Sequence, residues 1–280
     1  MSRVVVVTDS SANVPAHLVR QLDIRIVPIL LALNGRTFRD GEDITASRVY
    51  QWLRTSLYLP TTSAPSVGDF VRVYASATRD ASGIVSIHLS PKFSATYSAA
   101  LTASQLVDGA PIQLVNCHTA AMGQGFVVLE AARAAESGAD LAAVVARARE
   151  VASKMNLLAT LDTLEYLHRG GRIGGAATLV GTVLQIKPVL CVAKGHVDVF
   201  AKPRTRSGAI RTMLERMAET AAGRPLHAAI LHADVLEEAE ALRQQVADRF
   251  DCAELYITEL TPVMGAHTGP GVLGVVFYAE

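Results

Sequence analysis

The chain has no surplus of charge of either sign, and this absence narrows the range of its partners. Its 280 residues carry 26 Lys and Arg against 26 Asp and Glu, so the formal net charge is zero. Nucleic acids and anionic membrane surfaces are bound largely through an excess of basic groups. The sequence therefore argues against electrostatically driven binding of either one, and leaves open only a local basic patch.

Cysteine is scarce as well. Cys117, Cys191 and Cys252 are far apart, odd in number and without CxxC spacing. Disulfide frameworks and zinc sites require paired or closely spaced cysteines. The expectation is reduced thiols in a cytoplasmic protein. The histidines show neither HxH nor HExxH spacing, so a bound metal has little support.

Long apolar runs and nucleotide motifs are also missing. The apolar run at residues 4–7 is too short for a signal peptide, and no stretch approaches the roughly 20 apolar residues of a membrane span. Neither GxGxxG nor GxxxxGK[ST] occurs, so nucleotide phosphate binding has no motif behind it. A hydrophobic content of 50% with 19% charged residues is typical of a compact folded protein, and 280 residues suffice for one large or two modest domains.

What the chain does contain is an alternation of apolar runs, polar turns and helical patterns. Strands at 3–8, 83–88 and 112–115 each lead into a Ser-, Thr- or Asn-rich turn, and this alternation predicts a parallel sheet flanked by helices. Further strands are expected at 24–33 (interrupted by Pro28), 156–160, 186–192, 197–200, 226–231, 254–259 and 272–278. Helices are expected at 45–55, 67–78, 120–137, 142–155, 178–185 and 235–250, and after residue 206 with Ile210, Met213, Leu214 and Met217 in the core. Asn13 is a plausible N-cap, with Pro15 in the first turn of a helix. The character changes near residue 156, which predicts two α/β domains, 1–155 and 156–280, that share a cleft.

Polar clusters in the predicted loops are the candidate functional groups. Asp40 and its acidic neighbours lack a calcium-loop pattern and are interpreted as a solvated loop. The hydroxyls at 61–63 precede a predicted helix, where they either cap it or bind an anion. Basic side chains gather at Arg169, Arg172, Lys202, Arg204 and Arg206, as solvated surface or as a contact for a partner.

The segment 261–277 combines glycines and prolines with one histidine. Within residues 265–271 only His267 and Thr268 have side chains that donate or accept hydrogen bonds. Glycine permits positive φ and close approach of a ligand, while proline stiffens the chain. The pattern indicates a held loop that presents two polar groups before a buried strand. A structural turn with a buried histidine is the alternative.

Several short motifs together resemble the DegV family of bacterial fatty-acid-binding proteins, which includes the acyl-binding subunits of fatty acid kinase. In order, they are Thr8-Asp9-Ser10, Val27-Pro28-Ile29, Thr62-Ser63-Ala64-Pro65-Ser66, Phe93-Ser94-Ala95-Thr96-Tyr97, Leu167-His168-Arg169-Gly170-Gly171-Arg172-Ile173, Ile186-Lys187-Pro188, Arg204-Thr205 and Gly265-Ala266-His267-Thr268-Gly269-Pro270-Gly271. They extend over nearly the whole chain.

The resemblance implies two α/β domains with a buried tunnel between them for a long-chain fatty acid, palmitate among the candidates. It implies that Thr62, with Ser63, and Ser94 hold the carboxylate, and that His267 and Thr268 support them. It also implies a carrier without catalytic residues or cofactor. This carrier would present the acid to a separate ATP-dependent kinase and carry the acyl phosphate, with Arg172 and Arg204 facing the kinase or the phosphate.

The chain departs from the family pattern at three places. Ala64 replaces a glutamine. The 90–94 segment is bulkier than usual and is followed by Ala95 in place of a glycine, and Asn116-Cys117 stands where Asp-Ser is common. These changes predict altered chain selectivity or head-group geometry.

Two other functional classes are alternatives to a fatty-acid carrier. A serine hydrolase or transferase would use Ser94 with His267, but no GxSxG elbow surrounds the serine. A DNA-linked regulator has neither a recognition motif nor a basic domain in this chain.

Overall fold

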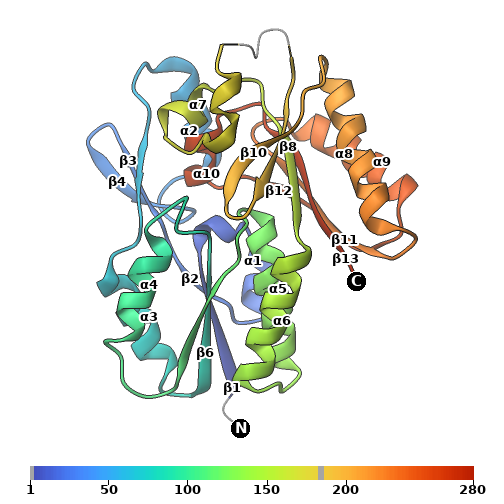
Figure 1. Cartoon of the computed structure of the whole chain (residues 1–280). Helices are drawn as coiled ribbons and strands as arrows, with labels where there is room; N and C mark the ends of the chain where they lie inside the picture. Colours follow the sequence, from blue (N-terminus) through green and yellow to red (C-terminus); the bar gives the residue numbers. More distant parts are fainter. Residues whose placement is uncertain (1–2, 182–185) are drawn as a thin grey trace.

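The computed structural model describes residues 3–181 and 186–280 and arranges them around three sheets (Figure 1). The first sheet is wholly parallel, in the order β2-β1-β6-β7, with β1 (Arg3–Asp9), β2 (Arg25–Val27), β6 (Ala81–His88) and β7 (Ile112–Asn116). Helices α3 (Val67–Ala77) and α4 (Thr96–Ser104) cover one face, and α5 (Met122–Glu136) and α6 (Leu141–Lys154) cover the other. Burial on both faces explains why the central strands are almost entirely apolar.

The second sheet is mixed and lies in the C-terminal part of the chain. Its order is β10-β9-β8-β13-β11-β12, with β8 (Asn156–Thr160), β9 (Val189–Ala193), β10 (His196–Ala201), β11 (Leu226–His232), β12 (Cys252–Glu259) and β13 (Leu273–Ala279). Only β11 and β12 pair in parallel among its described strands. Helices α8 (Arg206–Ala221) and α9 (Leu236–Arg249) pack against this sheet.

A small antiparallel sheet and a group of short helices complete the fold. The sheet has the order β4-β3-β5, with β3 (Leu30–Leu33), β4 (Arg36–Arg39) and β5 (Thr61–Ser63). The remaining helices are α1 (Ala16–Gln21), α2 (Ala46–Thr55), α7 (Glu165–Arg169) and α10 (Pro262–Thr268), with 3₁₀ helices η1 (Ser10–Ala12) and η2 (Gly174–Leu179). Helix α10 contacts α2, α7 and β3 (Figure 1). None of these described helices is long and apolar enough to cross a bilayer.

The predicted α/β class and the parallel first sheet are confirmed. The predicted core positions of Met213 and Met217 are also confirmed, because both side chains are fully buried. The hairpin predicted near residue 195 forms between β9 and β10, and Lys194 and Gly195 have φ of 50° and 76°, as in the tight turns that connect such strands. Every strand of the second sheet follows residue 155, but the boundary between domains 1–155 and 156–280 stays a prediction.

Two predictions near the N-terminus have different outcomes. The interruption expected at Pro28 within 24–33 is confirmed, and it separates two strands that belong to different sheets, because proline cannot donate a ladder hydrogen bond. The residues before Pro28 form edge strand β2, and those after it form β3 in the third sheet. Asn13 is not the N-cap of α1, but follows the 3₁₀ helix η1 as its C-terminal cap. Helix α1 begins at Ala16, and the Asn13 side chain instead donates to the Glu259 carbonyl (2.8 Å) and accepts from the Thr261 amide (3.1 Å).

Three further segments differ from expectation. Asp40, interpreted as part of a solvated loop, is only 2% exposed, because it follows β4 and turns inward with Phe38. The hydroxyls at 61–63 lie in strand β5, and the cap of α3 is Ser66, which forms a reciprocal capping box with Asp69. Residues 265–268, predicted as a loop, belong to helix α10.

The helix predicted at 178–185 can be compared with the structure only at residues 178–181. Residues 174–179 form the 3₁₀ helix η2, and residues 182–185 lie outside the described part of the chain.

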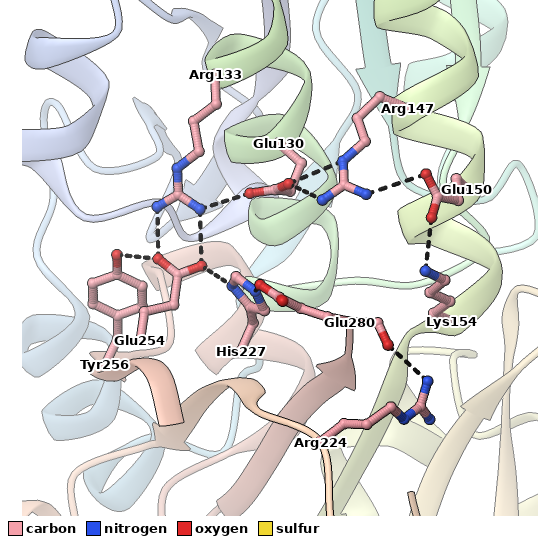
Figure 2. Close-up of polar contacts among 10 residues, drawn as sticks. All are labelled: Glu130, Arg133, Arg147, Glu150, Lys154, Arg224, His227, Glu254, Tyr256 and Glu280. Carbon is pink, nitrogen blue, oxygen red and sulfur yellow. Dashed lines mark hydrogen bonds and ion pairs between the residues drawn. The ribbon is translucent and has the colours of Figure 1, made fainter. Parts of the chain in front are cut away.

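A charged network joins helices α5 and α6 to the second sheet (Figure 2). Arg133 on α5 donates to both carboxylate oxygens of Glu254 on β12, at 2.9 and 2.6 Å, and to Glu130 at 2.7 Å. Arg147 on α6 also pairs with Glu130. The two guanidinium groups thus neutralise two nearly buried carboxylates. Burial alone would raise the pKa of Glu254, but hydrogen bonds from Arg133, His227 and Tyr256 and the charge of Arg133 lower it to about 2.

His227 extends the same network to the end of the chain. Its Nδ1 lies 2.6 Å from Glu254, and its Nε2 lies 3.0 Å from the side chain of Glu280. Donor atoms of Glu130, His227 and Glu254 lie within 4.8 Å of one another, as in a metal site. The guanidinium of Arg133, however, already bonds both carboxylates, so we interpret the cluster as an ion-pair network.

Candidate functional site

A cavity of about 370 Å³ lies between the first and second sheets, a volume within the range of small-molecule sites. Most of its wall is aliphatic. Leu89 comes from the first half of the chain, while Leu157, Leu190 and Val197 come from the second. The cavity therefore suits a ligand with a long apolar part, and it is the shared cleft that the sequence predicts.

The polar part of the wall contains all five predicted ligand residues. Thr62, Ser63, Ser94, His267 and Thr268 line the cavity, together with Arg172. Their elements are far apart in sequence: strand β5, the turn before α4, and helix α10.

The central polar contact joins Thr62 to His267. The Thr62 hydroxyl lies 2.7 Å from His267 Nε2. Thr62 pairs with Leu31 across the third sheet, and because strand side chains alternate, its neighbours Thr61 and Ser63 point the other way. Ser63 is exposed at the margin of the cavity, so it is less suited than Thr62 to a buried ligand.

His267 is held in a neutral state. Burial, together with the positive charge of Arg172, lowers its pKa to about 4. Gly170 allows this position, because a Cβ there would lie 2.7 Å from His267 Nδ1. A neutral imidazole carries one N–H and one acceptor nitrogen, so it can direct the Thr62 hydroxyl without bringing a second cation to the site.

Ser94 and Thr268 differ in the hydrogen bonds that they already make. Ser94 Oγ lies 2.8 Å from Thr96 Oγ1, where either hydroxyl can donate. The Ser94 proton is therefore available to a ligand when Thr96 donates to Ser94. The Thr268 hydroxyl donates to the Met264 carbonyl at 3.0 Å within α10. Thr268 has no second proton, so it lines the cavity chiefly as an acceptor and a methyl surface.

The two predicted arginines have different surroundings. Arg172 lines the cavity, and its guanidinium donates to the carbonyls of Phe93 (3.1 Å) and Gly170 (2.6 Å). Arg204 is exposed and is not among the described cavity residues. Nearby Arg169 and Arg206 already pair with Glu165 and Glu238 of the same chain.

The geometry does not favour the hydrolase alternative. Ser94 contacts Thr96 and His267 contacts Thr62, and no hydrogen bond between Ser94 and His267 is present among the described residues. Nucleophilic catalysis by serine requires the base within hydrogen-bonding reach, although unliganded sites can be looser.

A buried polar chain was missed from the sequence. Ser86 Oγ lies 2.7 Å from His88 Nε2, and His88 Nδ1 lies 2.7 Å from Asp9, which is the atom order of a catalytic triad. All three side chains are fully buried and none lines the cavity, so a substrate in the cavity does not reach them. Asp9 also accepts from Ser11, which does line the wall. The available signal was the position of Asp9 and His88 at the ends of neighbouring parallel strands.

Comparison with known proteins identifies the family. A family model described as "Uncharacterised protein, DegV family" matches residues 3–280. The chain belongs to the DegV family. A DegV domain-containing protein of Streptomyces coelicolor is 38% identical over 279 residues, covering 99% of both sequences.

Solved DegV structures share the fold over the whole chain. A DegV family protein from Thermus thermophilus, described for its fatty acid binding, matches with a TM-score of 0.95 and 36% identity over 99% of this chain and 100% of that one. DegV from Bacillus subtilis, described as a fatty acid binding protein, matches with a TM-score of 0.93 and 29% identity over 100% of both chains.

The departures from the DegV pattern lie mainly at the cavity. Ala64, Phe93 and Ala95 all line it. The altered selectivity expected from these residues stays a prediction, and their position gives it a physical basis because each changes the shape of the wall.

Proposed function

We propose that this DegV protein binds a long-chain fatty acid in the cavity, with the carboxylate at Thr62 and Ser94 and the hydrocarbon chain along the aliphatic wall. The observation that carries the proposal is the Thr62–His267 contact at 2.7 Å on the wall of a largely apolar cavity. The fatty acid binding described for the Thermus and Bacillus relatives supports the same ligand class.

The energetics of a fatty acid suit such a wall. Burying each methylene group contributes about 0.8 kcal/mol, so a long chain supplies on the order of 10 kcal/mol before ordering costs. An ionised carboxylate buried without partners would cost several kcal/mol or more. Hydroxyl donors from Thr62 and Ser94 offset that cost, because hydrogen bonds to a charged acceptor are stronger than those between neutral groups.

The neutral state of His267 gives it a directing role in this proposal. When Nε2–H donates to the Thr62 oxygen, the Thr62 proton turns towards the carboxylate. A doubly protonated imidazolium would instead form an ion pair with the ligand. The lowered pKa of His267 favours the first arrangement at neutral pH.

The second part of the proposal concerns the fate of the bound acid. The protein acts as a carrier that presents the carboxylate to a separate ATP-dependent kinase and then holds the acyl phosphate. A hydroxyl-bound carboxylate keeps an oxygen available for phosphoryl transfer, which a bidentate arginine clamp would hinder. Arg172 supports this reading, because its guanidinium bonds backbone carbonyls beside the proposed site. Exposed Arg204 is the candidate contact for the kinase.

Native mass spectrometry of the protein purified from cells tests the ligand class. We expect a non-covalent mass that matches a fatty acid and that leaves on denaturation. Protein stripped of lipid should bind an added fatty acid with 1:1 stoichiometry. An acyl mass that stays on Ser94 after denaturation would instead support the hydrolase, and absence of both bound and added lipid would refute the carrier.

A further inference from the structure

Helix α10 is attached at its N-terminal end to the first half of the chain, although it lies near residue 265. The Asn13 side chain bonds both the Glu259 carbonyl and the Thr261 amide, at 2.8 and 3.1 Å. The Tyr50 hydroxyl donates to the Leu260 carbonyl at 3.2 Å. These contacts fix residues 259–261, which lead into the first turn of the helix.

Asp40 makes the contact inside the first turn. Its Oδ1 accepts the backbone N–H of Val263 at 2.9 Å, one of the amides that a helix leaves unpaired at its start. The residue is 2% exposed, and its own backbone N–H donates to the Ile29 carbonyl at 2.9 Å. Asp40 thus ties the helix start to Ile29, the residue that precedes strand β3 of the sheet that also contains Thr62.

The ionisation state of Asp40 agrees with a hydrogen-bonding role. Burial raises the pKa of its carboxyl, and the hydroxyls of Ser10 and Thr261 and the Val263 amide offset part of the rise. Among the described residues, the second oxygen, Oδ2, has no hydrogen-bond partner. Oδ1 accepts from Val263 in either protonation state, so the contact does not depend on a full negative charge.

The helix carries the effect of this contact to His267. Val263 and His267 are four residues apart, about 6 Å along a helix axis. The helix is also packed tightly on its side, since a Cβ at Gly265 would lie 2.6 Å from the Tyr50 ring. A shift at the first turn therefore moves His267 relative to Thr62, and a hydrogen bond of 2.7 Å tolerates little displacement.

We propose that Asp40 is a positioning residue for head-group recognition, which fixes α10 through Val263 so that His267 directs the Thr62 hydroxyl at the ligand's carboxylate. The inference rests on the proposed function. It assigns a part in ligand recognition to a residue outside the cavity wall. It also gives a role to Asp40, a buried acid that forms no ion pair among the described residues.

Two variants of Asp40 separate positioning from general stability. Asp40→Asn keeps an oxygen acceptor for Val263, and Asp40→Ala removes it. The readout is the ratio of affinities for a fatty acid and for the primary alcohol of the same chain length, because both share the chain and only the acid needs the directed hydroxyl. We expect Asp40→Ala to lower this ratio by roughly fivefold or more, as for loss of a hydrogen bond of about 1 kcal/mol, and Asp40→Asn to retain it.

A second pair of variants covers the case in which Asp40→Ala does not fold. Val263→Pro deletes the donor and leaves Asp40 in place, because proline has no backbone N–H. Val263 also lines the cavity, but acid and alcohol share that part of the wall, so the ratio of their affinities still reports the head group. The substitution should lower the acid-to-alcohol ratio as Asp40→Ala does. Glu42→Ala, an exposed acid in the same loop, is the matched control and should leave the ratio unchanged.

The outcomes distinguish this inference from the proposed function. If the unaltered protein binds acid and alcohol equally, or neither, the head-group proposal fails. If the unaltered protein discriminates and Asp40→Ala or Val263→Pro retains the full ratio, only the role of Asp40 is overturned. Equal loss of acid and alcohol binding in a folded Asp40→Ala protein also overturns it, because it shows a general structural effect.

Discussion

The hydroxyl of Thr62 and Nε2 of His267 lie 2.7 Å apart although 205 positions separate the two residues in the chain. One comes from strand β5 of the small sheet and the other from the last turn of α10. The contact therefore forms only when the first and the second half of the chain have folded together. It places a hydroxyl with a fixed orientation on the cavity wall.

Replacing Thr62 by valine removes the hydroxyl and keeps the branched shape. We expect Thr62→Val to weaken fatty acid binding by about 1.5–3 kcal/mol, the range for a hydrogen bond to a charged group. Titration calorimetry with lipid-free protein measures this change. Thr61→Val is the matched control, since Thr61 lies on the opposite face of the same strand and is exposed. Equal weakening in both variants would contradict a specific role for Thr62.

His267 predicts a loss of stability in acid. Its pKa is lowered in the folded protein from 6.5 to about 4, so the unfolded chain binds the proton more readily. This contribution to stability is complete above about pH 6.5 and is lost as the pH falls towards 4. We expect the free energy of unfolding to fall by on the order of 2 kcal/mol more in the native protein than in His267→Asn between pH 7 and pH 4.5. Urea unfolding at the two pH values measures the difference, and parallel losses would refute it.

The network around Arg133 predicts a stability effect away from the cavity. Arg133→Met leaves the nearly buried Glu254 without its bidentate partner, and we expect a loss of about 2–4 kcal/mol in the free energy of unfolding. Arg243→Met is the control, because its pair with Glu240 is exposed and contributes less than about 0.5 kcal/mol. Chemical denaturation of both variants tests this. Comparable losses would show that the network contributes no more than a surface pair.

The folded-state pKa of Glu254 fixes the pH range of that contribution. The pKa is about 2 against 4.5 for an ordinary glutamate, so the stability supplied by Glu254 is present above pH 4.5 and is lost as the pH falls towards 2.

The contribution of His227 to stability depends on pH in the opposite direction. Burial alone would lower its pKa, but hydrogen bonds to Glu254 and Glu280 raise it, so its contribution is complete below about pH 6.5 and is lost as the pH rises through the raised value. Thermal unfolding of His227→Gln across this range should show the native advantage shrinking with rising pH.

Charge reversal at the two arginines separates partner contact from ligand binding. If the proposed kinase docks on Arg204, Arg204→Glu should weaken phosphorylation of the bound acid about tenfold while fatty acid affinity stays unchanged, because Arg204 is exposed and outside the cavity wall. Arg172→Glu should weaken both, since it also breaks the bond to the Phe93 carbonyl beside Ser94. A reconstituted phosphorylation assay with parallel binding measurements decides the matter. Normal phosphorylation of Arg204→Glu would remove Arg204 from the interface.

The parallel first sheet could be predicted from local patterns, because an apolar strand and the polar turn that follows it are determined by residues close together in the sequence. The polar wall could be predicted through the ordered motifs, which brought Thr62, Ser94 and His267 into one hypothesis. The burial of Asp40 could not be predicted from neighbouring residues. It depends on an amide at Val263 that arrives only with the folding of the second half.

The same limit applies to other parts of the site. The acidic residues around Asp40, at 39–43, are typical of a solvated loop. Only its position two residues after Phe38, on the same face of the strand, indicated that the Asp40 side chain points into the protein. His88 looked isolated in sequence because its partner Asp9 is 79 positions away, on the adjacent strand. The helical state of residues 265–268 was obscured by glycines, although Pro262 and the Thr261 cap favour a helix start.

The attachment of α10 has a consequence for how a bound molecule can leave. The helix is fastened to the first half through Asn13 and Asp40, and it continues into β13 through Gly269 and Gly271, whose φ values are 75° and 90°. Thr62 and His267 are thereby held together on the side of the first half, whereas Leu190 and Val197 of the cavity wall belong to the second sheet. For the fatty acid that we propose as ligand, we therefore expect a separation of the two sheets to expose the hydrocarbon chain before the carboxylate loses its contact with Thr62.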